Sequence, residues 1–253
     1  MVDTRSLNRP DYGWRARVGV AAPQANPTVE PEMRALLPQG VEVYGTRLTH
    51  PSPLVEERLM HYVSHMSESI RTFGTMKLAA YGFGCTGSSY LAGREQEDRF
   101  AAEASSACLV PVITAAQAIR LALSTIGARS MALVSPYPES LAEAGYRYWR
   151  DAGLSVTAKL RVDPQLTDTH GIYEFTSDDA LAALRAVDSS AADVIVASGT
   201  GMPTLRALRT LRGEAGRDRP ASKPVLSSNL CLAWALLRSA APELAPAAPM
   251  GLL

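Results

Sequence analysis

The chain has no excess of charge of either sign and no long hydrophobic run. Its 253 residues contain 25 Lys and Arg against 25 Asp and Glu, so the formal net charge is zero. A balanced charge gives no overall field that would attract nucleic acid or an anionic membrane. No apolar run approaches the roughly 18 to 20 residues of a membrane-spanning helix, and the first residues lack the apolar core of a secretory signal. We therefore expect a cytoplasmic protein with neither a nucleic-acid nor a membrane partner.

Cysteine is also scarce. The three cysteines, Cys85, Cys108 and Cys231, are odd in number and lack the spacing of a metal site, so they predict reduced thiols and exclude a disulfide or zinc framework. His61 and His65 stand four residues apart, a spacing that can bind a metal, but no carboxylate motif accompanies them. The sequence predicts no metal and no cofactor.

The most informative stretch is residues 78–90, where an apolar run ends in small and hydroxyl-bearing residues with Cys85 at the bend. Hydrophobic residues without alternation are typical of a parallel strand that is buried on both faces. Ligands bind at the carboxyl ends of such strands. A cysteine at this end, beside the N-terminus of a helix, has its thiolate favoured, whereas a cysteine inside an apolar strand is usually inert. We expect Cys85 to be reactive, and Cys108 and Cys231 to be inert.

The second half of the chain repeats the first. Residues 193–204 again form an apolar run followed by a small-residue bend, and Gly199 occupies the position of Cys85. The segments that follow, 110–117 and 223–229, also match: each has a short strand after proline and then a helix with a hydroxyl at its N-cap. A repeat of more than about a hundred residues indicates domain duplication rather than a solenoid.

Strands and helices alternate along the chain, which predicts parallel sheets. The expected fold is α/β, with two pseudo-symmetric, flavodoxin-like parallel-sheet lobes and the active site in the cleft between them. We expect a polar N-terminal tail at 1–14, a first lobe at 15–127 that carries Cys85, a second lobe at 128–240 that carries Gly199, and a C-terminal tail at 241–253.

The pattern further predicts single helices at about 54–73, 89–106 and 203–214, with a polar loop at 215–222. Residues 162–177 show no period and could form a mobile flap. Thr28 is a plausible N-cap of the helix that begins at Val29. Asn26, just before Pro27, is either an Asx-turn residue or a contact to ligand.

The order and spacing of several motifs resemble the aspartate/glutamate racemase superfamily, and within it the group of maleate cis-trans isomerases and arylmalonate decarboxylases. The motifs are the run at 12–20, Pro-x-x-Asn-x-Thr-x-Glu-x-Glu at 23–32, Gly-Cys-Thr-Gly at 84–87, Pro-Tyr at 136–137, Met-Pro-Thr-Leu at 202–205 and Pro-Val-Leu-Ser-Ser-Asn at 224–229. The resemblance extends over nearly all of residues 12–240.

The resemblance implies that the two bends hold the carboxylates of a small diacid with backbone N–H groups and hydroxyls. It implies catalytic roles for Cys85, Tyr137 and Asn26 and a homodimer or homotetramer. For the bends, the alternative is that their small residues only form tight turns. For Tyr137, the alternative is a half-buried aromatic side chain at the surface. An asparagine usual in the second-lobe flap has no clear counterpart, although Thr169 and His170 fall nearby. The expected substrate-binding residues are Pro23, Gln24, Thr86, Gly87, Gly199, Thr200, Gly201 and His170.

The isomerases carry a second cysteine where this chain has Gly199, and this departure limits the chemistry. Two-base racemisation needs an acid and a base on opposite faces of one carbon, which a single thiol cannot supply. Reversible addition of the Cys85 thiolate to an alkene needs only one nucleophile. We therefore expect a cofactor-independent isomerase of the maleate-to-fumarate type. The alternatives are an arylmalonate-type decarboxylase with Cys85 as proton donor, and a catalytically silent diacid-binding protein.

Overall fold

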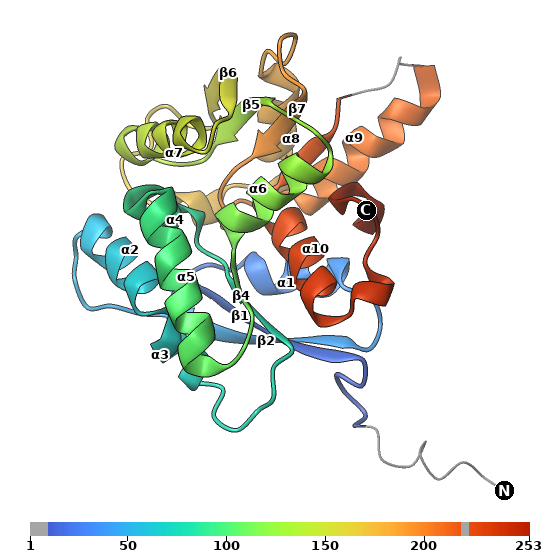
Figure 1. The fold of residues 1–253 in the computed structure, drawn as a ribbon. Coiled ribbons are helices and arrows are strands. Elements are labelled where there is room, and N and C mark those ends of the chain that lie inside the picture. Colours follow the sequence, from blue (N-terminus) through green and yellow to red (C-terminus); the bar gives the residue numbers. More distant parts are fainter. Residues whose placement is uncertain (1–9, 219–222) are drawn as a thin grey trace, which may run out of the picture.

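The computed structural model describes residues 10–218 and 223–253, which form two four-stranded parallel sheets (Figure 1). The first sheet has the order β2-β1-β3-β4 and the second the order β6-β5-β7-β8, so the two sheets repeat one topology. The strands are β1 (Ala16–Pro23), β2 (Val41–Leu48), β3 (Ala80–Phe83), β4 (Val112–Thr114), β5 (Ser130–Ser135), β6 (Ser155–Arg161), β7 (Val194–Ala197) and β8 (Val225–Ser227). The predicted α/β class and the two matching parallel sheets are confirmed.

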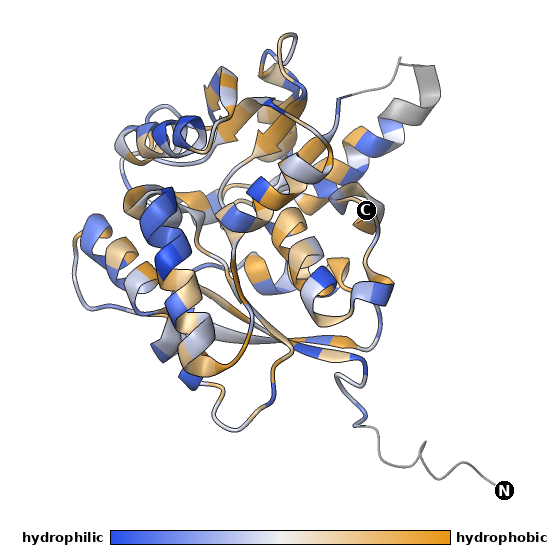
Figure 2. Cartoon of the chain, in the orientation of Figure 1, coloured by the Kyte–Doolittle hydropathy of each residue, from blue (hydrophilic) through white to orange (hydrophobic). Residues whose placement is uncertain are grey.

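Helices join successive strands within each sheet. They are α1 (Val29–Leu36), α2 (Val55–Ser64), α3 (Met66–Arg71), α4 (Thr86–Ala92), α5 (Arg94–Cys108), α6 (Ala115–Thr125), α7 (Glu139–Asp151), α8 (Ser177–Ala186), α9 (Leu205–Asp218) and α10 (Ser228–Ala240), with 3₁₀ turns η2 (Gly171–Glu174), η3 (Pro242–Leu244) and η4 (Pro249–Leu252). Hydrophobic residues concentrate on the strands and on α10, and hydrophilic residues on the outward face of α5 (Figure 2).

The burial of each strand agrees with its place in the sheet. All four residues of the inner strands β3 and β7 are buried, whereas exposure alternates along the edge strand β6. An inner strand of a parallel sheet is covered on both faces, so an uninterrupted apolar run suits it and alternation suits an edge. The N-cap predictions at β4–α6 and β8–α10 are confirmed, because Thr114 and Ser227 each accept a hydrogen bond from a backbone N–H in the next helix.

Three helix predictions were wrong in their bounds. The single helix expected at 54–73 is interrupted at His65, which separates α2 from α3. The helix expected at 89–106 begins earlier, at Thr86, and is broken at Gly93, whose φ of 75° is a left-handed value that glycine adopts freely. Helix α9 continues to Asp218, into the expected polar loop. Residues 219–222 of that loop and 1–9 of the expected N-terminal tail lie outside the described residues.

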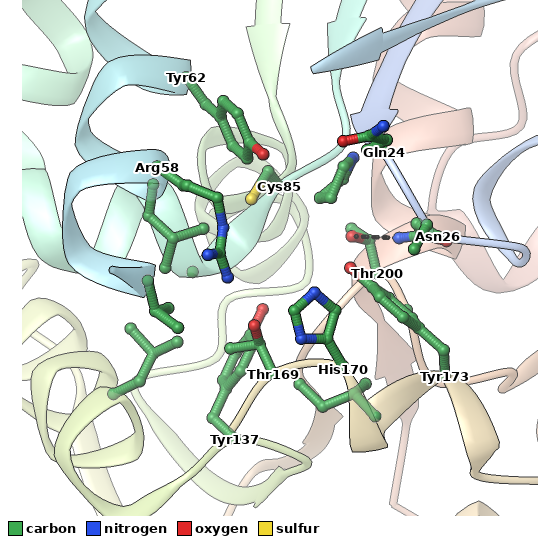
Figure 3. A pocket seen from close by; sticks show the side chains of 18 of the residues that line it. Gln24, Asn26, Arg58, Tyr62, Cys85, Tyr137, Thr169, His170, Tyr173 and Thr200 are labelled. Carbon is green, nitrogen blue, oxygen red and sulfur yellow. Dashed lines mark hydrogen bonds between the residues drawn. The ribbon is translucent and has the colours of Figure 1, made fainter. Parts of the chain in front are cut away.

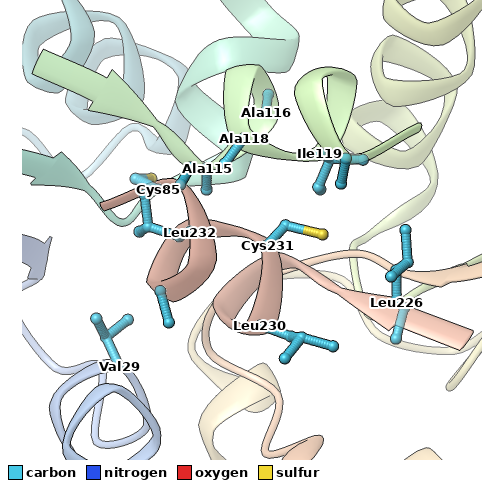
Figure 4. Packing of buried hydrophobic residues seen from close by; sticks show 14 of the residues in the cluster. Val29, Cys85, Ala115, Ala116, Ala118, Ile119, Leu226, Leu230, Cys231 and Leu232 are labelled. Carbon is cyan, nitrogen blue, oxygen red and sulfur yellow. The ribbon is translucent and has the colours of Figure 1, made fainter. Parts of the chain in front are cut away.

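The last helix crosses between the two halves. Helix α10 follows β8 of the second sheet, yet it packs on β1, β3 and β4 of the first sheet and on α6, its counterpart in the first half. A Cβ atom at Gly82 would lie 2.8 Å from Leu236 Cδ1, so the absence of a side chain on β3 allows this approach. The buried alanines of α6 also pack against α10 (Figure 4). The packing therefore joins the halves through a shared core.

Residues 241–253 fold back on the body of the protein rather than extending as the expected tail. They form η3 and η4, which pack on α10, and Trp234 Nε1 donates a hydrogen bond of 2.9 Å to the carbonyl of Pro246. Arg212 Nη1 donates to the carbonyl of Met250 at 2.7 Å. Among the helices of the described residues, none has both the length and the apolar character needed to cross a membrane.

A buried carboxylate ties the two halves together. Glu32 on α1 is 7% exposed, and the backbone N–H groups of Thr204 and Leu205 each donate to its Oε1 at 2.6 Å. Asn229 Nδ2 of α10 donates to Oε2 at 2.8 Å. Burial raises the pKa of Glu32 above its usual value, and the hydrogen bonds from Asn229, Leu205 and Thr204 oppose that rise. One side chain of the first half thus accepts hydrogen bonds from the backbone N–H groups at the start of α9 in the second half.

Replacing Glu32 tests this link. Glu32→Ala leaves the N–H groups of Thr204 and Leu205 and the amide of Asn229 without their partner, which should lower the free energy of unfolding by roughly 3 kcal/mol. Chemical denaturation measures it. Glu30→Ala on the same helix is the control, because Glu30 pairs only with the partly exposed Arg47 and its loss should cost less than about 1 kcal/mol. Equal losses for both variants would contradict the proposed link.

Candidate active site

A cavity of about 450 Å³ lies where the carboxyl ends of the strands of both sheets meet (Figure 3). Cys85 contributes to its wall from the end of β3, Asn26 from the loop after β1, and Tyr137 and Thr200 from the loops after β5 and β7. The remaining wall comes from the loop after β2, from α2, from the start of α7 and from the segment around η2. The lining residues are Pro23, Gln24, Ala25, Asn26, His50, Ser52, Val55, Arg58, Leu59, Tyr62, Cys85, Gly87, Tyr137, Leu141, Thr169, His170, Ile172, Tyr173, Thr200 and Gly201.

The structure brings most of the predicted site residues together. Those that line the cavity are Pro23, Gln24, Asn26, Cys85, Gly87, Tyr137, His170, Thr200 and Gly201. Thr86 and Gly199 do not line it. Thr86 is fully buried, and its hydroxyl donates to Ser228 Oγ at 3.3 Å. Its side chain therefore stabilises the contact with α10 instead of facing a ligand.

The Cys85 thiol sits at the bend between β3 and α4 and is 3% exposed. Ser88 Oγ donates to its Sγ at 3.1 Å, and the backbone N–H groups of Gly87 and Ser88 also point at the sulfur. Burial raises the pKa of Cys85 above its usual value, and these donors only partly oppose the rise. The expectation that the helix start favours the thiolate is thus wrong, because desolvation outweighs the hydrogen bonds.

Gly199, the counterpart of Cys85, has a φ of 87°. A Cβ atom at this position would lie 2.5 Å from Pro136 Cγ. The space that a second side chain would need is therefore occupied by the loop after β5. Backbone conformation and local packing both favour glycine here.

Hydrogen bonds between the halves fix the two bends. Thr200 Oγ1 donates to the carbonyl of Gly84 at 2.7 Å, and Asn26 Nδ2 donates to Thr200 Oγ1 at 3.4 Å. Thr28 Oγ1 donates to the carbonyl of Gly201 at 2.7 Å. The Thr200 hydroxyl donates its hydrogen to a carbonyl of the protein, so this hydrogen is not available to a ligand.

Asn26 forms an Asx turn and also lines the cavity, while its contact with a ligand stays a prediction. Its Oδ1 accepts hydrogen bonds from the backbone N–H groups of Thr28 at 2.9 Å and Val29 at 3.3 Å, which is the Asx-turn geometry. Thr28 is the N-cap residue of α1, as predicted, but its side chain makes no cap hydrogen bond, and Asn26 Oδ1 accepts from the N–H groups at the helix start instead. Asn26 nevertheless lies on the cavity wall.

Three tyrosines surround the thiol in the cavity: Tyr62, Tyr137 and Tyr173 (Figure 3). Burial raises the pKa of each phenol, and the proximity of Cys85 raises it further. All three are therefore protonated near neutral pH and can donate hydrogen bonds to an anion. Only Tyr137 was singled out from the sequence.

Sequence reasoning missed the contribution of α2. Val55, Arg58, Leu59 and Tyr62 line the cavity with the spacing of one helical face. This periodicity was readable in the sequence, but the surface that the face meets was not. Arg58 is the sole arginine or lysine among the lining residues of the described chain, and no Asp or Glu lines the cavity there.

The segment at 162–177 forms one side of the cavity through η2. Thr169, His170, Ile172 and Tyr173 face it, and the His170 side chain is 66% exposed at the rim. Asp168 accepts hydrogen bonds from the backbone of His170 and Gly171, which shapes the turn. The predicted flap thus borders the cavity, and its mobility stays a prediction.

The histidines of α2 are stacked on each other rather than arranged around a site. The ring centroids of His61 and His65 lie 4.1 Å apart, and those of His61 and His50 lie 4.4 Å apart. Within the described residues, no group of three or more His, Cys, Asp or Glu side chains is placed to hold a metal ion.

Comparisons with known proteins agree on one group. The arylmalonate decarboxylase family model matches residues 18–253. Maleate isomerase from Pseudomonas putida is 25% identical over 235 residues, which cover 88% of this chain and 91% of that protein.

Solved structures give the same picture. A crystal structure of a Pseudomonas putida maleate isomerase with maleate superposes with a TM-score of 0.77 at 21% identity, covering 88% of this chain and 90% of that one. Maleate cis-trans isomerase from Nocardia farcinica, in a mutant with a covalently bound succinylcysteine intermediate, gives a TM-score of 0.74 at 23% identity, covering 88% and 92%. With the family model matched over nearly its whole length, the chain belongs to the arylmalonate decarboxylase family.

Proposed function

We propose that the chain is an isomerase of a small unsaturated dicarboxylate, of the maleate-to-fumarate type, with Cys85 as nucleophile. The observation that carries the proposal is a single thiol on the wall of a cavity that holds one arginine and, in the described chain, no carboxylate. Such a cavity favours an anionic ligand that a sulfur can attack. The maleate isomerases among the relatives, one of them with a cysteine-bound intermediate, support the same chemistry.

The reaction requires three steps: addition, rotation and elimination. The Cys85 thiolate forms a C–S bond to one alkene carbon, and the π electrons pass to the adjacent carbon and its carboxylate. The former double bond is now single and rotates. The electrons then return, the C–S bond breaks, and the trans alkene and the thiolate are restored. No redox partner is needed, which supports a cofactor-independent reaction.

The residues around the thiol are suited to the charge that develops. The neutral phenols of Tyr137 and Tyr173 can donate to the carboxylate that receives the electrons, and donors fixed in advance stabilise such charge most effectively. The N–H groups of Gly87 and Ser88 point at the sulfur and favour its anionic form as it leaves. We place substrate carboxylates at Asn26 and at the bend of Thr200 and Gly201.

Decarboxylation of a 2-substituted malonate is the second candidate, because the matching family model is that of arylmalonate decarboxylase. Cys85 would then protonate the carbanion left by carbon dioxide, and a thiol with a raised pKa is suited to donate a proton. Incubation with phenylmalonate and with maleate separates the two, since only decarboxylation releases carbon dioxide.

Replacement of the nucleophile is the direct test. Cys85→Ser should lower kcat for maleate isomerisation by at least about a thousandfold, because the hydroxyl is a far weaker nucleophile and leaving group. Proton NMR of maleate and fumarate measures the rate. Cys108→Ser, at the end of α5 outside the cavity, is the matched control and should keep full activity. Unchanged turnover in Cys85→Ser would refute the mechanism.

The raised pKa of Cys85 predicts its alkylation profile. Because the thiolate fraction is small at neutral pH, the rate with iodoacetamide should rise about tenfold per pH unit and keep rising past the ordinary thiol pKa of about 8.5. Mass spectrometry of the Cys85 peptide follows it, with the urea-unfolded chain as control. A plateau below about pH 7 would contradict a raised pKa. A thiol that resists alkylation at every pH, in a protein that still binds diacids, would favour the silent binding protein.

Gly199 should not accept a second thiol. Gly199→Cys places Cβ against Pro136 at a left-handed φ, so we expect a loss of roughly 2–4 kcal/mol in unfolding free energy and no gain of racemase activity. Gly127→Ala is the control: its φ is 71°, but nothing lies within 4 Å of the added atom, so strain without overlap should cost about 1–2 kcal/mol. A Gly199→Cys variant as stable as wild type would contradict this prediction, because it would show that the loop after β5 can move to make room for the side chain.

A further inference from the structure

The cavity is larger than a four-carbon diacid requires. Its volume of about 450 Å³ falls within the range of about 300–1,000 Å³ that encloses drug-sized ligands. Asn26 and Thr200, where we place the diacid, lie on one side of Cys85, whereas Arg58 and Tyr62 approach from α2 on another side (Figure 3). A diacid held at the first side leaves the second side open for a substituent.

Hydrogen bonds to the backbone orient Arg58 on this second side of the cavity. Its Nη1 donates to the carbonyls of Ser52 at 3.0 Å and Pro53 at 2.8 Å, which fix the plane of the guanidinium. Within the described chain, its Nε and Nη2 donate no hydrogen bond and no carboxylate pairs with it. The guanidinium points into the cavity (Figure 3). An oriented guanidinium whose Nε and Nη2 are both free to donate is suited to bidentate binding of a carboxylate.

The hydroxyl of Tyr62 completes this subsite. Tyr62 is one helical turn from Arg58 on the same face of α2, its ring is buried, and its hydroxyl points toward the cavity (Figure 3). Burial raises the pKa of this phenol, so it is a neutral donor rather than a competing anion. Val55 and Leu59 of the same helix also line the cavity, and their apolar side chains suit a short hydrocarbon link.

We infer that the substrate is a maleate-like diacid with a third carboxylate on a short side chain at the alkene, and that Arg58 and Tyr62 bind this third carboxylate. The inference rests on the proposed function for the placement of the diacid at Asn26 and Thr200, and it adds the substrate class. Arg58 would then set specificity, and the electron movements at Cys85 would stay the same.

Binding to the Cys85→Ser variant tests the substrate class without turnover. The probes for calorimetry are cis-aconitate, which is maleate with a carboxymethyl group, citraconate, which is maleate with a methyl group, and maleate itself. A charge-assisted pair should make cis-aconitate bind about tenfold to a hundredfold more tightly than the other two. Citraconate separates the effect of charge from that of bulk. Equal affinities for the three probes, or no binding of cis-aconitate, would overturn the inference.

Changing Arg58 in the same background assigns the preference to this side chain. Arg58→Gln should abolish the preference for cis-aconitate, because it should weaken cis-aconitate binding at least about tenfold more than it weakens maleate binding, whereas Arg58→Lys should keep part of the preference. Arg150→Gln is the matched control, because Arg150 is a largely exposed arginine of α7 outside the cavity. Thermal unfolding shows whether each variant is folded. If Arg58→Gln is unstable, the comparison of Arg58→Lys with wild-type Arg58 tests the inference. A preference that survives in both variants would refute the role of Arg58.

The two proposals fail separately. If wild type converts neither maleate nor cis-aconitate to a trans isomer while the Arg58-dependent preference persists, the isomerase proposal falls and the substrate class stands. If maleate is isomerised but the preference is absent, the isomerase proposal stands and the third-carboxylate subsite falls.

Discussion

The carboxylate of Glu32, buried between the two halves, is the constraint on which the cavity depends. It joins the start of α1 to the start of α9 and to α10, and these elements carry the loops that face each other across the cavity. A buried carboxylate is tolerated only when its oxygens are hydrogen-bonded, so the relative position of the halves is specified closely. Asn229 extends the link, because its amide also donates to the carbonyl of Thr200 at 3.1 Å.

Apolar packing adds to this polar link. Helix α10 leaves the second sheet and covers the first, where Gly82 lets Leu236 approach the strand closely. On the other side of the molecule, Tyr90 of α4 and Ser198 share a hydrogen bond of 2.7 Å, and Trp149 Nε1 donates to the Tyr90 hydroxyl at 2.9 Å. Two sheets that could have been independent units thus share one core, and the space between their strand ends is held at a fixed width.

The packing of the two halves determines which groups face each other across the cavity. Duplication places two equivalent bends face to face, but one carries Cys85 and the other carries Gly199 with Pro136 against it. The resulting site is asymmetric, with a thiol on one face and backbone on the other. Burial raises the pKa of Cys85 and of the surrounding phenols, so the cavity wall presents neutral hydrogen-bond donors and the guanidinium of Arg58, with no carboxylate among the lining residues of the described chain.

The sequence alone determined the α/β class, the duplication and the position of Cys85 at a strand end, because these follow from local hydrophobic patterns and from a repeat that can be read along the chain. The tertiary structure decided the breaks at His65 and Gly93, the return of residues 241–253 and the crossing of α10. It alone placed Arg58 in the cavity, turned Thr86 away and raised the pKa of Cys85. Burial and facing surfaces depend on contacts between residues far apart in the sequence, and local patterns carry no record of such contacts.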